Sequence, residues 1–146
     1  MTEPPFRPGD FVWSAYPERE NPARPDPRHI GYVTAVTGSL SVNAVFLAYT
    51  TSQLWHDPKP FGLTAFNRDE AAGMGQSRPF TLDLRRLAAV WATPEWFPDI
   101  GTPSRGVVGR APQRLRVQIE ATAKDLLRRH PDLIERLGPL WPGSRR

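Results

Sequence analysis

Apolar residues recur at every second position over several short stretches of the chain, which is the spacing of β-strands. The longest stretch covers residues 44–53, where Val45, Leu47 and Tyr49 fall on one face and two more apolar side chains fall on the other. Because both faces are apolar, we expect this strand to lie at the centre of a sheet.

Further strands are predicted at residues 11–16, 30–37, 62–66, 78–84 and 87–91, with one helical turn at 68–73. The Pro- and Arg-rich segment 17–28 is predicted to be an exposed loop, and the region up to Gly109 another loop. Gly38 and Ser39 predict a hairpin turn that pairs strand 30–37 with the central strand. This hairpin would bring Arg28 close to Thr51.

Helical spacing begins late in the chain. Pro112 is suited to the first turn of a helix that runs to about His130, with an apolar stripe of Leu115, Ile119, Ala123, Leu126 and Leu127. Pro131 predicts a second short helix that ends before Gly138. The expected fold is therefore mainly β (β-rich α+β), with a strongly twisted antiparallel sheet of five or more strands that closes toward a barrel.

The length of 146 residues suits a single domain, with a barrel core at about 6–110 and a helical region at 112–140. The chain has no cysteine and only three scattered histidines, so we expect no disulfide, no metal site and no cofactor. No charged-then-apolar leader and no apolar run of membrane-spanning length occur, which predicts a cytoplasmic protein without membrane contact.

The net charge of +4 comes almost entirely from arginine, since Lys59 and Lys124 are the only lysines. The planar guanidinium donates in a fork that matches phosphate oxygens, so the composition favours nucleic acid. A GC-rich genome also replaces Lys by Arg, and the excess of charge is small. The charge alone leaves both explanations open.

Three candidate features each have a structural alternative. Thr50, Thr51 and Ser52 follow the central strand, where hydroxyls can serve a ligand or merely cap a turn. The aromatic residues Trp13, Tyr16 and Tyr32 alternate within strands as core residues do, although they also suit the cage of a Tudor-like peptide binder. The Trp96-Phe97 corner is expected to pack in the core and not to stack on bases.

Several segments in order resemble the PemK/MazF family of growth-inhibiting toxins of type II toxin–antitoxin systems. The resemblance is carried by a Gly-Asp pair before a Trp-containing strand, an Arg that closes a Pro-rich loop, a Tyr-x-Thr-Ser segment, an Asp followed by Arg, and an approach to a last helix. In this sequence these are residues 6–13, Arg28, residues 49–53, residues 80–86 around Asp83, and residues 106–110.

The resemblance implies an SH3-like barrel, a homodimer, a cognate antitoxin and metal-independent cleavage of single-stranded RNA (mRNA). In this cleavage the ribose 2′-hydroxyl attacks the adjacent phosphate, and the implied catalytic residues are Arg28, Thr51 and Asp83. The implied RNA-binding residues are Arg24, His29, Thr50, Ser52 and Gln53.

Two departures from the family pattern keep alternatives open. The family usually has Arg-Pro before the second strand, so Arg24-Pro25 competes with Arg28 for the catalytic role. Thr81 stands where some members have an Arg two residues before the Asp. A catalytically impaired barrel that binds RNA or a protein partner is therefore the second hypothesis.

Homodimerisation is also expected, because two-sided apolar strands and an amphipathic helix give more apolar surface than one core needs.

Overall fold

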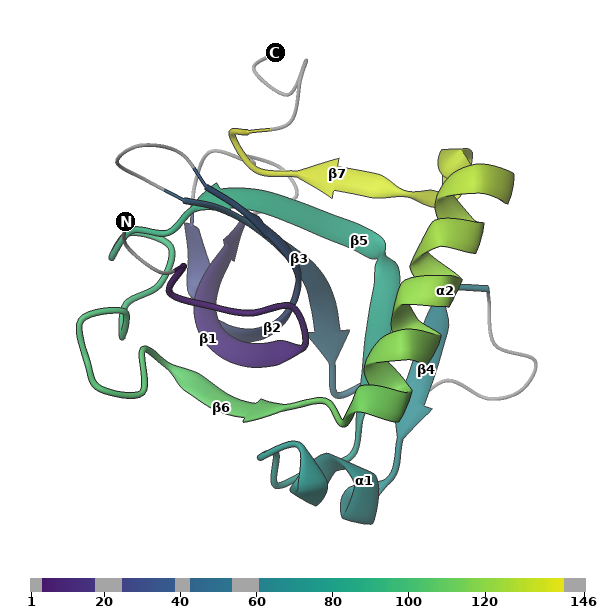
Figure 1. The fold of residues 1–146 in the computed structure, drawn as a ribbon, viewed down its shortest axis with the longest axis horizontal. Helices are drawn as coiled ribbons and strands as arrows, with labels where there is room; N and C mark the ends of the chain where they lie inside the picture. Colours follow the sequence, from purple (N-terminus) through teal and green to yellow (C-terminus); the bar gives the residue numbers. More distant parts are fainter. Residues whose placement is uncertain (1–3, 18–24, 39–42, 54–60, 141–146) are drawn as a thin grey trace.

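The computed structural model describes residues 4–17, 25–38, 43–53 and 61–140, with the backbone alone for residues 25–28. One seven-stranded sheet dominates this part of the chain (Figure 1). Its strands are β1 (Asp10–Pro17), β2 (Pro25–Thr37), β3 (Ala44–Thr51), β4 (Leu63–Phe66), β5 (Phe80–Trp91), β6 (Val107–Arg110) and β7 (Glu135–Leu137). The helices are α1 (Arg68–Gly73), α2 (Gln113–Arg129) and a 3₁₀ turn at Pro131–Leu133.

The order β4-β5-β3-β2-β1-β6 places β3 inside the sheet, as its two apolar faces predict. Every pairing on this path is antiparallel, and β7 adds to β5 in parallel. The expected mainly β fold with α-helices is confirmed.

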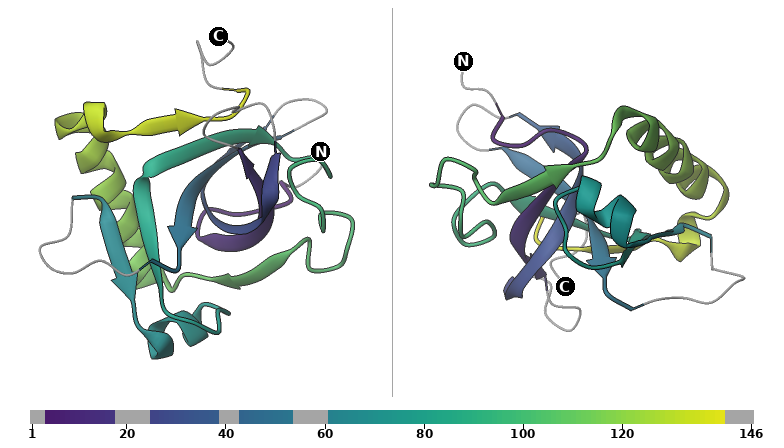
Figure 2. Two further views of the ribbon diagram at one scale, coloured as in Figure 1. Left: turned by 180° about the vertical axis from the view of Figure 1, so that it is seen from behind. Right: turned by 90° about the horizontal axis from the view of Figure 1, so that it is seen from below.

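The sheet is strongly curved but not closed into a barrel, because β4 and β6 form the two ends of the described path and do not pair (Figure 2). The segment after α1 fills part of this gap. A Cβ on Gly75, whose φ is +78°, would lie 1.8 Å from the carbonyl oxygen of Val108, and one on Gly109 would lie 2.0 Å from that of Met74. Only glycine allows the two backbones to approach so closely. Because β4 and β6 do not pair, the predicted barrel closure is wrong for this part of the chain.

Four boundaries differ from the sequence prediction. Strand β2 already starts at Pro25, so the end of the expected loop 17–28 is extended chain. Strand β5 is one continuous bent strand where two were expected, and β6 occupies part of the expected loop before Gly109. The second predicted helix is only a 3₁₀ turn followed by β7, so the expected helical region does not continue to residue 140. Pairing partners supplied by β5 and β1 override weak local preferences here.

The apolar side chains form two clusters, one on each face of the sheet. Phe11 and Tyr32 belong to the cluster under α2, whereas Val12 and Tyr16 belong to the cluster that contains Trp96 and Phe97. Trp96 and Phe97 are fully buried, as expected of a packing corner. Since one chain covers both strand faces by itself, the apolar surplus that predicted a dimer is smaller than the sequence indicates.

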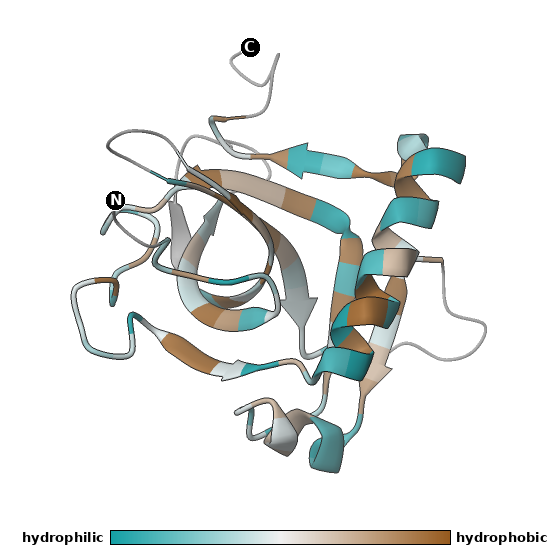
Figure 3. Ribbon diagram, in the orientation of Figure 1, coloured by the Kyte–Doolittle hydropathy of each residue, from teal (hydrophilic) through white to brown (hydrophobic). Residues whose placement is uncertain are grey.

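Helix α2 packs on the sheet through part of its predicted stripe. Ile119 and Leu126 are buried and Leu115 and Ala123 partly so, but Leu127 is 56% exposed. The correction follows from the 100° step per residue, which turns Leu127 away from the sheet when Leu126 faces it. Hydrophilic and hydrophobic stretches alternate along the helix in Figure 3. No helix in the described ranges is long and apolar enough to cross a membrane.

Candidate functional site

The end of β3 meets the first half of β5 at an open cavity of about 420 Å³. Tyr49 pairs with Asp83 and Thr51 with Thr81, so these side chains share one face of the sheet. The cavity is lined by Tyr49, Thr51, Gln53, Asp83, Arg85, Arg86, Leu133 and Glu135. It combines hydroxyl, guanidinium and carboxylate groups within one hollow.

A bulge in β5 supplies both arginines. Ala48 pairs with Leu87 while its neighbour Tyr49 pairs with Asp83, which leaves Leu84, Arg85 and Arg86 without partners on β3. The ladder is instead held by the Leu84 amide, which donates to the carbonyl of Gly62 at 3.0 Å. Such a bulge bends the strand and redirects its side chains. The bend carries the two guanidinium groups to the cavity.

Asp83 holds Arg85 by accepting three of its N–H groups. Its Oδ1 accepts from the Arg85 amide and from Nε, both at 3.0 Å, and its Oδ2 accepts from Nη2 at 3.1 Å. Asp83 is only 5% exposed, whereas the Arg85 side chain is 24% exposed. The hydrogen bonds that the Arg85 guanidinium donates to the Asp83 carboxylate raise the pKa of Arg85 above its usual value. Arg85 is thus a fixed cation at the cavity wall.

Arg86 lies over an aromatic ring. Its guanidinium carbon is 3.7 Å from the centre of the Tyr49 ring, and the His29 ring stacks on Tyr49 at 4.5 Å between centres. Since one ring face cannot hold both groups at these distances, Tyr49 lies between them. Arg86 Nε is buried, has no hydrogen-bond partner among the described residues, and lies 3.6 Å from Glu135 Oε1. The cation is oriented by stacking more than by hydrogen bonds.

Tyr16 contacts both the Tyr49 ring and the backbone of Arg86. Its hydroxyl donates to the carbonyl of Arg86 at 2.9 Å, and burial raises the pKa of Tyr16 well above its ordinary value. Tyr16 and Tyr32 are buried in different clusters on opposite sheet faces. They therefore cannot form the aromatic cage with Trp13 that was one alternative from the sequence.

A second cavity of about 410 Å³ adjoins the first and shares Thr51 with it. It is lined by Trp13, His29, Ile30, Thr50, Thr51, Ser52, Gly75, Gln76, Ser77, Arg78, Pro79, Phe80 and Val108. Thr50 Oγ1 donates to the carbonyl of Ile30 at 2.5 Å, and His29 Nε2 donates to the carbonyl of Thr50. The segments of β2 and β3 that line the second cavity are therefore joined by side-chain hydrogen bonds.

The structure brings most of the predicted site residues into these two cavities. Thr51, Gln53 and Asp83 line the first, and His29, Thr50, Thr51 and Ser52 line the second. The backbone amide of Gln53 donates to Thr51 Oγ1 at 3.1 Å, which orients that hydroxyl.

Neither of the two candidate arginines of the loop has a described side chain. Arg24 lies outside the described residues, and Arg28 is described only by its backbone, which pairs with Ala15 in β1. The predicted contact between the Arg28 side chain and Thr51 therefore stays a prediction.

Sequence reasoning missed Arg85, Arg86 and Glu135 as site residues. Arg85 and Arg86 follow Asp83 directly in the sequence, but only the bulge decides that both reach the cavity. Glu135 arrives through the parallel pairing of β7 with β5, which no periodic pattern indicates. In the described ranges, no three His, Asp or Glu side chains gather in a way that would hold a metal ion.

Neither the family models nor the curated proteins that were compared with the chain give a match. The assignment of a function therefore depends on the chemistry of the two cavities.

Proposed function

We propose that this chain is a metal-independent endoribonuclease of the PemK/MazF type, an SH3-like toxin of a type II toxin–antitoxin system that cleaves single-stranded RNA. The observation that carries the proposal is the first cavity, where the hydroxyl of Thr51, the cations Arg85 and Arg86 and the carboxylates Asp83 and Glu135 line one hollow. These groups correspond to the parts that RNA transesterification needs.

The reaction requires charge stabilisation and two proton transfers. When the 2′-oxygen attacks phosphorus, the bond from phosphorus to the 5′-oxygen breaks, leaving a cyclic phosphate and a 5′-hydroxyl. Negative charge grows on the phosphate oxygens, where directed donors such as Arg86 and Thr51 stabilise it most. A carboxylate accepts the 2′-hydroxyl proton, and an acid returns a proton to the leaving oxygen.

Glu135 fits the proton acceptor better than Asp83 does. The Asp83 carboxylate is buried and already accepts three N–H donors from Arg85. The side chain of Glu135 is 34% exposed and lines the cavity. In this proposal Asp83 positions Arg85, although the sequence resemblance implied a catalytic role for Asp83 itself.

The cavity does not attract phosphate by net charge, because its two arginines and two carboxylates balance. Selectivity for a phosphodiester instead comes from directed donors that are fixed before the ligand arrives. Arg28 and Arg24 stay candidates for an additional cation. A cognate antitoxin and a homodimer belong to the same proposal.

The test is cleavage of mixed-sequence single-stranded RNA in EDTA, with mapping of the new ends. We expect 2′,3′-cyclic phosphate and 5′-hydroxyl ends, and on the order of a hundredfold slower cleavage for Arg86→Gln and for Thr51→Val. Arg114→Gln, at an exposed position on α2, is the matched control. Arg28→Ala and Arg24→Ala decide between the two loop arginines. Wild-type rates for Arg86→Gln and Thr51→Val together would refute this site.

A catalytically impaired RNA- or protein-binding module is the second candidate. The observation in its favour is that each cavity arginine already faces a carboxylate, Arg85 at 3.0 Å and Arg86 at 3.6 Å. Wild-type protein that binds RNA but produces no new ends would favour this function.

A further inference from the structure

The second cavity has the size and walls of a small-molecule site. Its volume of about 410 Å³ lies within the usual range of roughly 300–1,000 Å³ for such sites. Six of its lining residues are apolar or aromatic, and these are Trp13, His29, Ile30, Pro79, Phe80 and Val108. Flat apolar walls of this kind suit an unstacked base, because every base has a π-face.

Gln76 supplies a donor that the protein does not use. Its backbone amide donates to the carbonyl of Ala71 at 2.9 Å, which fixes the main chain at the cavity wall. Its side-chain Nε2 is buried and has no hydrogen-bond partner among the described residues. Because the amide gives up no hydrogen bond to the protein when it turns, it can rotate toward a ligand acceptor without loss.

Thr51 connects this cavity to the reaction site. It lines both cavities, so a chain whose phosphate lies at Thr51 in the first can place a neighbouring base in the second. Arg78 is exposed at the lining of the second cavity, where a guanidinium can meet the next phosphate of the strand.

We propose that the second cavity is a base-binding subsite, in which the aromatic and apolar walls hold one unpaired nucleobase next to the scissile phosphate and Gln76 donates to an acceptor on that base. This inference rests on the proposed ribonuclease function for its place beside the cleaved bond. The subsite gives the enzyme a preference among bases at one position next to the cut.

The test compares Gln76→Met with wild type on mixed-sequence RNA, with sequencing of all cleavage sites. Removing a buried donor without a partner leaves the fold intact, which circular dichroism checks. We expect the preference at one position beside the cut to weaken by about threefold to tenfold, the effect of one hydrogen bond. Gln118→Met, at an exposed position on α2, is the control and should leave the preference unchanged.

A second measurement does not depend on cleavage. An all-2′-deoxy hexanucleotide cannot undergo the reaction, and its affinity can be followed by the change in tryptophan fluorescence, to which Trp13 at the cavity wall contributes. Gln76→Met should weaken binding of a uridine-type hexamer more than binding of an abasic one. An unchanged site preference in a folded variant, or equal loss for both hexamers, overturns the subsite. A wild type that cleaves no RNA but shows the Gln76-dependent binding refutes the ribonuclease and supports the subsite.

Discussion

The pair of Asp83 and Arg85 offers the sharpest prediction, because its geometry gives the size of the effect. In Asp83→Asn one carboxylate oxygen becomes an NH₂ group. If the amide oxygen takes the place of Oδ1, the two bonds at 3.0 Å survive and the bond from Nη2 is lost; the opposite orientation loses two bonds. At least one charge-assisted hydrogen bond therefore disappears in either orientation.

The expected loss of stability follows from this count and from exposure. A hydrogen bond to a charged group contributes about 1.5–3 kcal/mol, and breaking a fully buried ion pair costs about 3–5 kcal/mol. Because the Arg85 side chain is 24% exposed, water recovers part of the loss. We expect Asp83→Asn to lower the free energy of unfolding by about 1–3 kcal/mol.

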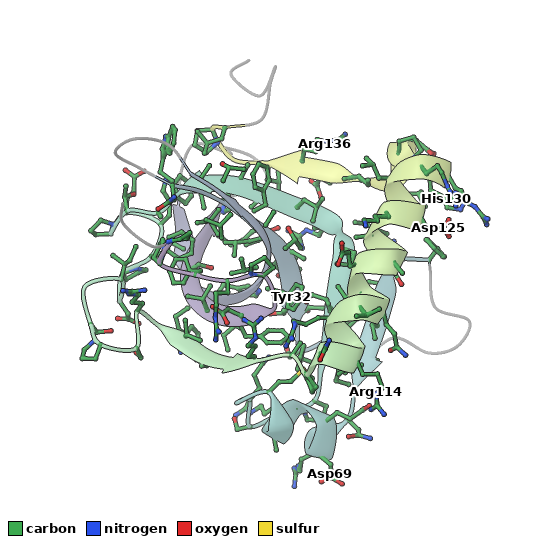
Figure 4. The ribbon with its side chains drawn as sticks, in the orientation of Figure 1. Tyr32, Asp69, Arg114, Asp125, His130 and Arg136 are labelled. Atoms are coloured by element: carbon green, nitrogen blue, oxygen red, sulfur yellow. The ribbon has the colours of Figure 1, made fainter. Side chains whose placement is uncertain are left out.

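Urea denaturation at neutral pH measures this change, with Arg128→Ala as the matched control. Arg128 is 74% exposed and pairs with Asp125 at 3.2 Å on α2, whose Asp125 is labelled in Figure 4. Such an exposed pair contributes no more than about 1 kcal/mol. If Asp83→Asn costs no more than Arg128→Ala, the argument from burial and hydrogen bonding is refuted.

A double-mutant cycle separates positioning from proton transfer. If Asp83 acts only through Arg85, then Asp83→Asn and Arg85→Ala slow RNA cleavage by similar factors and the double variant is no slower than Arg85→Ala. If Asp83 is instead the proton acceptor, Asp83→Asn slows RNA cleavage far more than Arg85→Ala does. The second outcome would return the base role from Glu135 to Asp83.

Three further predictions concern the fold and its assembly. Burial raises the pKa of Tyr32 from 10.0 to about 12, so the unfolded chain ionises first and the free energy of unfolding should fall by about 2 kcal/mol between pH 10 and 12. Tyr32→Phe should flatten that part of a pH series of urea titrations. Gly75→Ala places a Cβ 1.8 Å from a backbone oxygen and should cost at least about 2 kcal/mol in thermal unfolding, whereas Gly73→Ala, with open space around it, should cost nothing. Sedimentation at micromolar concentration should give a dimer, and a single species of 16.4 kDa would contradict the expected homodimer.

The sequence by itself determined the elements that depend on local periodicity. The central strand with two apolar faces, the strand at 62–66, the helical turn at 68–73 and the start of α2 beside Pro112 were predicted from spacing and turn residues, and all are present. The register of β3 also follows from its pattern, because a slip by one residue would turn Tyr49 and Thr51 to the other face. The sequence and its family resemblance also indicate Thr51 and Asp83 as candidate site residues, and the two line the same cavity.

Only the tertiary structure decided how the site is completed. The bulge that brings Arg85 and Arg86 to the cavity is set by how β5 pairs with both β3 and β4, and the parallel contact that brings Glu135 joins residues far apart in the chain. The close approach of Gly75 to Val108, which fills part of the gap between β4 and β6, likewise joins residues far apart in the chain. Periodicity reports which face of an element is apolar, but it carries no information about which distant strand supplies the partner. That choice is made by the packing of the whole chain.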